Sequence, residues 1–273
     1  MKKLAKLGLV AITLVTMGCN FGNRNEGPLQ VAFVSHTYHL HKHKDIQDML
    51  VQSINQEKPK YIFSLGDVVL VNDDFRWKKA EEFFGKLDGP VYFSPGNHDL
   101  HSFYEVESQE TDRHYPERRQ QYIDRIGYVN KMVQDDNADF IMINSNDPFI
   151  KTQPFLDESI AKANPNTPNF LLTHHPIWID RYRKNWIQWY WRSIKRDEIA
   201  PYLADFQRII VGDISGSIQH HKFNETPATM IGIGNDGDPV FWVLATLQDN
   251  GEFSFEAKTI ELPEHHPYKK KQR

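Results

Sequence analysis

Residues 61–99, YIFSLGDVVLVNDDFRWKKAEEFFGKLDGPVYFSPGNHD, decide the fold that the sequence predicts. Two short apolar runs of β type, YIFSL and VYF, end abruptly in Gly66-Asp67 and in Gly96-Asn97-His98-Asp99. The intervening FRWKKAEEFFGKL has the apolar spacing of an amphipathic helix. A strand, a helix and a strand joined by a right-handed crossover form the parallel α/β unit. The stretch therefore predicts an α/β fold whose ligands bind at the carboxyl ends of the strands.

The same type of strand ending recurs along the chain. LQVAFVS is followed by His36, NFLLT by His174-His175, and RIIV by Gly212-Asp213. Because the carboxyl ends of parallel strands meet at one edge of a sheet, these polar residues are expected to form a single cluster.

The remaining pattern predicts the elements around this cluster. DIQDMLVQSINQ and PFLDESIAKAN have helical spacing, and residues 100–125 are read as a polar surface excursion over the strand ends. Two β segments flank the Asp-Asp-Asn turn at 135–137. TMIGIG, VFWVLATL and EFSFEAKTIEL are expected to be three consecutive strands of an antiparallel end piece.

The N-terminal residues differ from the rest of the chain. Three lysines precede the apolar run LGLVAITLVTM, which is too short to span a bilayer, so residues 1–18 are predicted to be a signal peptide. Residues 19–28 are read as a tether, 29–263 as one large domain, and 264–273 as a solvated basic tail.

Cys19 is the single cysteine of the 273 residues and directly follows Gly18. This resembles the lipobox of bacterial lipoproteins, although Thr16 stands where leucine is usual. The resemblance implies a lipid anchor on Cys19 and a place on the membrane of a bacterial cell envelope, in the outer membrane or on the periplasmic face. An ordinary signal peptide cleaved nearby, with a spare thiol at Cys19, is the alternative.

Net charge bears on the class of partner. Removal of the leader takes away three lysines and no acids, which changes the formal net charge from −4 to −7. An acidic mature protein argues against nucleic acid as a partner.

YIFSLGD, VYFSPGNHD and LLTHHP resemble successive motifs of the calcineurin-like metallophosphoesterases, a family that includes the purple acid phosphatases. The similarity covers roughly Leu29 to Leu262. It implies a four-layer αββα sandwich with mixed sheets. It also implies hydrolysis of phosphomonoesters or phosphodiesters, on a small phosphorylated substrate, by metal-activated water.

The resemblance assigns roles to matching residues. Asp67 would bridge two metal ions, Asn97 would offer a neutral oxygen, and His174 an imidazole nitrogen. His98 would steady charge on the phosphate or protonate the leaving oxygen, and Asp99 would orient the His98 ring. His175 is expected to be structural or to lie outside the ligand shell.

Two motifs depart from the family pattern. The opening Asp-x-His is His36-Thr37-Tyr38 here, and the closing Gly-His-x-His is Gly212-Asp213-Ile214-Ser215. Asp213 can complete one metal site with Asp67, Asn97 and His174. For the second site, His36 is a fair ligand, Tyr38 a possible one and Ser215 a poor one.

Other histidines are further candidates for the second site, namely His39, His41, His43, His220 and His221. The oxygen and nitrogen donors suit divalent or trivalent Mn, Fe or Zn, with one ion expected and a second possible.

The lost ligands leave alternatives open. The chain is a phosphoesterase, a catalytically impaired scaffold or binding protein of the same fold, or a hydrolase of something other than a phosphate. The tryptophans and arginines of residues 178–196 are core or lid packing, or else a stacking, cationic wall for a ligand.

Overall fold

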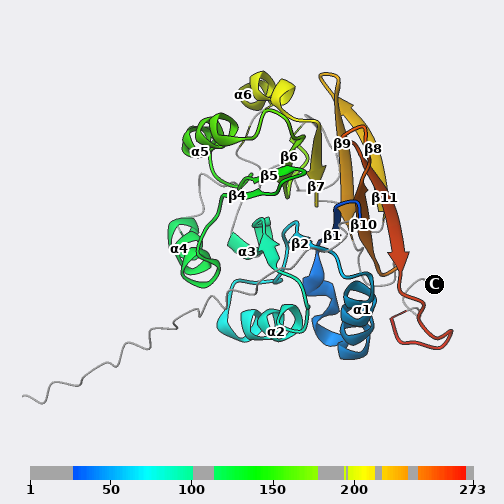
Figure 1. The fold of residues 1–273 in the computed structure, drawn as a ribbon. Coiled ribbons are helices and arrows are strands. Elements are labelled where there is room, and N and C mark those ends of the chain that lie inside the picture. The colour runs from blue at the N-terminus through cyan, green and yellow to red at the C-terminus, as the bar shows by residue number, and fades with distance from the viewer. Residues whose placement is uncertain are drawn as a thin grey trace, which may run out of the picture.

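The computed structural model describes residues 27–100, 114–177, 194, 196–212, 217–232 and 239–268 (Figure 1). Two mixed sheets lie between helical layers, with α1 and α2 on one side and α5 and α6 on the other. The five-stranded sheet has the order β11-β10-β1-β2-β3, and the six-stranded sheet has the order β4-β5-β6-β7-β9-β8. The strands are β1 (Gln30–Val34), β2 (Tyr61–Ser64), β3 (Val91–Phe93), β4 (Lys131–Gln134), β5 (Asp139–Met142), β6 (Asn169–Thr173), β7 (Arg208–Val211), β8 (Ser217–Phe223), β9 (Thr226–Gly232), β10 (Phe241–Leu247) and β11 (Phe253–Thr259). The helices are η1 (Thr37–Lys42), α1 (Lys44–Glu57), α2 (Asp74–Phe84), α3 (Asn97–Leu100), α4 (Tyr115–Ile126), α5 (Phe149–Lys162), α6 (Arg196–Ile199) and η4 (Ala200–Asp205).

Three apolar clusters separate four layers. Successive residues of β1 point to opposite faces, so Ala32 packs with α1 and α2 while Phe33 packs between the sheets. The cluster between the sheets joins Phe63 to Phe140, with ring centroids 4.7 Å apart. A third cluster lies between the six-stranded sheet and α5, α6 and η4. The predicted four-layer αββα sandwich is confirmed.

Parallel pairing brings the polar strand ends together. β1, β2 and β3 are parallel neighbours in one sheet, and β5, β6 and β7 are parallel neighbours in the other. The two sheets touch at these ends, where the Ser35 hydroxyl donates to the Gly212 carbonyl oxygen. Residues that follow β1, β2, β3, β6 and β7 therefore lie at one edge of the sandwich.

The expected antiparallel end piece of three strands is wrong. β9 belongs to the six-stranded sheet, parallel to β7, whereas β10 and β11 form a hairpin beside β1 in the other sheet. β8, which the sequence reading missed, pairs with β9 at the sheet edge. Part of the expected surface excursion is a regular helix, α4, which buries Tyr115 and Tyr122.

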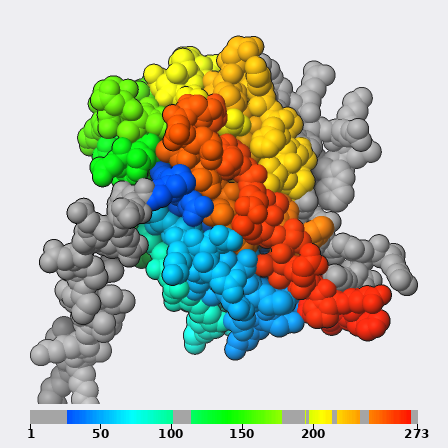
Figure 2. All heavy atoms as spheres, turned by 45° about the vertical axis from the view of Figure 1, so that its right-hand side comes forward, coloured from blue at the N-terminus to red at the C-terminus, as the bar shows by residue number. Residues whose placement is uncertain are grey.

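The beginning of the predicted solvated tail packs on the domain. Tyr268 is 1% exposed, and its ring lies edge-on to His43, with centroids 5.2 Å apart. His266 Nε2 lies 2.8 Å from Asp45 Oδ2 of α1. Figure 2 shows this red C-terminal segment beside the blue region that contains α1.

Within the described residues, no helix has both the length and the apolar character needed to cross a bilayer. Residues 1–18, Cys19 and the Trp/Arg segment at 178–193 lie outside the described residues.

Candidate metal centre

Three side chains from three strand ends converge at the edge where the sheets meet. Nε2 of His36 lies 3.4 Å from Asp67 Oδ2, and Nε2 of His174 lies 3.5 Å from Asp67 Oδ1. One ligand atom from each residue lies within 4.8 Å of the others, and all three side chains are buried. In the described part of the chain this is the one group of three His, Cys, Asp or Glu residues with such spacing.

The orientation of each imidazole is fixed by the nitrogen that faces away from Asp67. His174 Nδ1 lies 2.7 Å from the Leu65 carbonyl, and His36 Nδ1 lies 2.7 Å from the Ser35 hydroxyl. Because Ser35 donates its own hydrogen to Gly212, its oxygen accepts from His36. In the neutral ring a protonated Nδ1 leaves the Nε2 lone pair directed at the cluster, the arrangement typical of metal-ligating histidines.

The backbone at the cluster is strained. His36 and Asp67 have φ angles of 54° and 56°, in the left-handed region that non-glycine residues seldom adopt. A Cβ on Gly66 would come within 2.5 Å of His174 Nδ1, and one on Gly96 within 2.2 Å of Asp67 Oδ1. Glycine is therefore required at both turns for the strand ends to approach this closely.

Asp99 is a clamp for the turn that carries Asp67. Its buried carboxylate accepts four backbone N–H groups at 2.8–3.0 Å, from Asp67, Val68, Val69 and Gly96. The sequence reading expected Asp99 to orient His98. In the structure, His98 Nδ1 is held instead by the Leu70 carbonyl, 3.0 Å away. Asp99 thus contributes by holding the backbone of the turn.

His98 and Tyr38 border the cluster. His98 Nε2 lies 3.8 Å from Asp67 Oδ2, and the His98 backbone N–H donates to Asp67 Oδ1 at 3.1 Å. The Tyr38 ring lies beside the His98 ring, with centroids 4.9 Å apart.

Asn97 precedes His98 in α3 and is tied to His175, whose Nε2 lies 3.2 Å from Asn97 Oδ1. His175 Nδ1 in turn lies 2.8 Å from the hydroxyl of Ser145. The sequence reading did not single out Ser145, although NSND follows an apolar strand there just as at the other strand ends.

Burial and charge set the protonation of the cluster. Burial alone would raise the pKa of Asp67, but His174, His98 and His36 hold it well below its usual range. Burial lowers the pKa of His36 to about 3, against the opposing pull of Asp67. Burial and the charge of Asp67 raise the pKa of Asp99 to about 7, although backbone N–H groups favour its ionised form. At neutral pH the cluster therefore offers a carboxylate and an uncharged imidazole at His36.

This donor set fits a borderline metal ion such as Mn, Fe or Zn, because it combines imidazole nitrogens with a carboxylate oxygen. Asp213 and Ser215 lie outside the described residues. The other candidate histidines are not members of the group. The His39 ring lies 6.5 Å from the His36 ring, His41 and His43 lie on and after η1, and His220 and His221 lie on β8.

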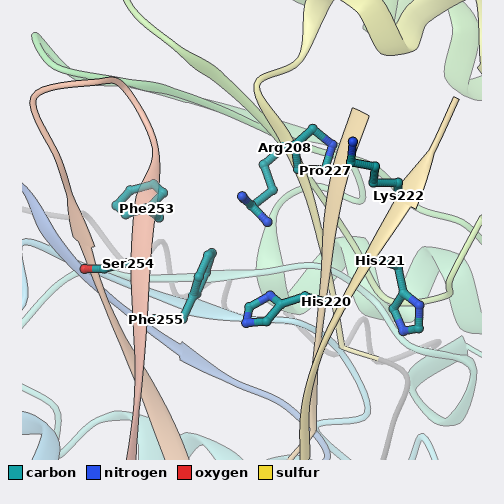
Figure 3. A pocket seen from close by; sticks show the side chains of 8 residues that line it. All are labelled: Arg208, His220, His221, Lys222, Pro227, Phe253, Ser254 and Phe255. Atoms are coloured by element: carbon teal, nitrogen blue, oxygen red, sulfur yellow. The ribbon is translucent and has the colours of Figure 1, made fainter. Parts of the chain in front are cut away.

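A hollow of about 680 Å³ lies between the outer strands β8 and β11 (Figure 3). Arg208, His220 and Phe255 face one another across it. The Arg208 guanidinium already pairs with Glu252 at 2.8 Å. Because Glu252 neutralises Arg208, this arginine is not available to bind a phosphate group in the hollow.

Comparison with known proteins follows this geometry. The model of the family described as calcineurin-like phosphoesterase matches residues 36–225. A dimetal phosphatase from Danio rerio superposes with a TM-score of 0.55 and 11% identity, covering 85% of this chain and 97% of that one. A purple acid phosphatase from yellow lupin (Lupinus luteus) seeds gives a TM-score of 0.63 and 10% identity, covering 85% of this chain and 52% of that one. No curated protein sequence matches.

Proposed function

The chain belongs to the calcineurin-like phosphoesterase family, and we propose on this basis that it hydrolyses phosphomonoesters or phosphodiesters of small molecules in a metal-dependent reaction. The observation that carries the proposal is the convergence of His36, Asp67 and His174, with ligand atoms within 4.8 Å of one another. The acidic net charge favours a small phosphorylated substrate over a nucleic acid.

His36, Asp67 and His174 would hold one ion, because both imidazoles face the same carboxylate. Asn97 would add a neutral amide oxygen, and Asp213 is proposed as a further carboxylate ligand after β7. A bound Mn, Fe or Zn ion would polarise the phosphoryl group and lower the pKa of the attacking water.

His98 is the proposed proton donor and charge stabiliser. Its Nδ1 is held by the Leu70 carbonyl, so its Nε2 faces the side of the cluster where Asp67 lies. In the imidazolium form, Nε2–H donates a hydrogen bond to a phosphoryl oxygen and a proton to the leaving oxygen. Tyr38, packed on the same ring, limits how far His98 can turn.

Hydrolysis of p-nitrophenyl phosphate and bis(p-nitrophenyl) phosphate, with Mn²⁺ or Zn²⁺ added, tests the proposal. We expect Asp67→Asn and His174→Ala to lower turnover by about 100-fold or more, since the first removes the negative charge of a ligand and the second removes a ligand nitrogen. His221→Ala is the matched control, because this histidine of β8 is exposed and is not a member of the ligand group. Unchanged turnover in both ligand variants would contradict the proposal. Wild-type protein that retains metal without hydrolysing any ester would support the scaffold alternative instead.

We further propose that Cys19 carries a lipid anchor that holds the protein on the bacterial cell envelope. The basic and apolar leader and the Gly18-Cys19 pair support this proposal. Wild-type protein should partition into the detergent phase of Triton X-114, and Cys19→Ser should move to the aqueous phase. Equal partitioning of the two proteins would contradict the anchor.

A further inference from the structure

We propose that Ser145 and His175 position the side-chain amide of Asn97, and that His175 acts through this amide without binding metal itself. The inference rests on the proposed function, because it concerns the metal affinity of the same centre. Ser145 follows β5, His175 follows β6 and Asn97 begins α3, so the three residues link both sheets.

The three residues form a continuous hydrogen-bonded chain that runs from the buried Ser145 to the half-buried Asn97. Ser145 Oγ lies 2.8 Å from His175 Nδ1, and His175 Nε2 lies 3.2 Å from Asn97 Oδ1. The backbone N–H of His175 also donates to Ser145 Oγ, at 3.2 Å. Ser145 is 0% exposed and His175 is 3% exposed, so solvent does not compete for the bond between them, whereas Asn97 is half-buried.

The direction of the bonds follows from the groups present. An amide oxygen can only accept, so Nε2 of His175 must carry the hydrogen that it donates to Asn97. Nδ1 then has a lone pair, which accepts the hydroxyl hydrogen of Ser145. The reverse arrangement would place a bare Nε2 against an oxygen and would turn the amide so that its NH₂ faced His175. Donation from the Ser145 hydroxyl to Nδ1 stabilises this tautomer, whose protonated Nε2 holds the oxygen end of the amide.

This arrangement leaves the Asn97 oxygen able to bind a cation. A carbonyl oxygen has two lone pairs, so it can accept from His175 with one and offer the other to metal. Asn97 is also held beside Asp67, because the backbone N–H of the next residue, His98, donates to Asp67 Oδ1.

Strand geometry separates the two adjacent histidines. Successive side chains at the end of β6 point to opposite sides. His174 thus faces Asp67, while His175 faces Ser145 and Asn97, with the two rings nearly perpendicular at 78°. His175 is not a member of the ligand group.

The test compares His175→Gln with His175→Asn in the full-length protein. The amide nitrogen of glutamine reaches the place of imidazole Nε2, whereas that of asparagine reaches only Nδ1. We expect Mn²⁺ affinity, measured by titration calorimetry, to fall by about 10-fold or more in His175→Asn and Ser145→Ala. The Mn²⁺ affinity of His175→Gln should stay within about threefold of wild type, and so should that of the buried control Ser159→Ala in α5. The visible absorption bands of the Co²⁺-loaded protein should shift in His175→Asn but not in His175→Gln.

Wild-type affinity in His175→Asn and Ser145→Ala would overturn the inference. Equal losses in the Asn and Gln variants would also overturn it, because they would indicate a packing role alone. A wild-type protein that binds no Mn²⁺, Zn²⁺ or Co²⁺ would overturn both this inference and the proposed function. The expected pattern of affinities without any ester hydrolysis would support the positioning role and remove only the proposed activity.

Discussion

At the scale of single residues, the centre depends on side chains that hold the ligands as much as on the ligands themselves. Asp99 secures the turn of Asp67 with four accepted hydrogen bonds, and Ser35 and Leu65 fix the two facing imidazoles. These supporting contacts determine where each ligand atom lies, since a free histidine or aspartate side chain samples several rotamers.

Asp99→Ala should destabilise the fold by about 3–5 kcal/mol, because four buried N–H donors lose their acceptor at once. Urea unfolding measures this change. Asp73→Ala is the control: Asp73 caps the N-terminus of α2 through the backbone N–H of Arg76 and is only half-buried, so its loss should cost about 1 kcal/mol. A loss in Asp99→Ala no larger than that of the control would contradict the clamp.

Stability should fall on acidification through His41. Burial, with Lys79, Arg76 and His39 nearby, lowers the pKa of His41 to about 4 from its usual 6.5. Between these two values the unfolded chain binds a proton that the folded chain does not, so lowering the pH favours unfolding. From pH 7.5 to pH 5.5 this costs about 1 kcal/mol. His41→Gln should therefore lose about 1 kcal/mol less than wild type over this range in urea unfolding. An equal loss in both proteins would contradict the lowered pKa.

The sequence predicted which polar residues meet at this centre better than it predicted their supporting contacts. Asp67, His36 and His174 were expected together because polar residues that end parallel strands share an edge, and the structure brings them within reach of one ion. The contacts of Asp99 and Ser145 depend on which loop lies against which, and no local pattern encodes that. Residue roles in catalysis stay predictions.

At the scale of elements, the turn after β2 has no room for a side chain at Gly66, because the His174 ring and the Gly96 backbone lie against it. Gly66 has a φ angle of +90°, and a Cβ there would meet the His174 ring and the Gly96 backbone. Gly127, which ends α4 with a φ angle of +89°, has no atom within 4 Å of such a Cβ.

Gly66→Ala and Gly127→Ala form a matched pair that separates backbone strain from steric overlap. Each substitution should lower the free energy of unfolding by about 1 kcal/mol, because alanine disfavours the left-handed backbone. Only Gly66→Ala should also displace His174 and weaken Mn²⁺ binding by about 10-fold or more. Equal metal affinity in the two variants would show that the turn does not need this approach.

The pairing of the C-terminal strands was the main feature of the fold that the sequence predicted wrongly. β9, β10 and β11 were each expected as strands, but periodicity does not reveal which sheet a strand joins. β10 lies between β11 and β1 in the five-stranded sheet, whereas β8 and β9 join the other sheet, so the C-terminal part of the chain is divided between the two sheets. The helix α4 was missed because its charged residues outweigh its few buried ones.

At the scale of the whole molecule, the aromatic cluster between the sheets holds the two halves of the centre together. Phe63 and Phe140 come from different sheets, and both are fully buried. Because His36 and Asp67 follow strands of one sheet and His174 follows a strand of the other, the spacing between sheets sets the spacing of the ligands.

Phe140→Ala should destabilise the fold by about 3–5 kcal/mol through the lost burial and the cavity it leaves. Phe75, which is 67% exposed on α2, provides the contrast, and Phe75→Ala should change stability by no more than about 0.5 kcal/mol. Thermal and urea unfolding of both variants measure the difference. Similar midpoints for the two would contradict the assignment of the core.

The most direct test of a single metal centre is the metal content of the full-length protein isolated without chelators, measured by plasma mass spectrometry. We predict close to one equivalent of Mn, Fe or Zn per chain in the wild type, and a loss of that equivalent in both Asp67→Asn and His174→Ala. No bound metal after soaking in Mn²⁺ and Zn²⁺ would contradict the account. Two equivalents would contradict the single shared ion.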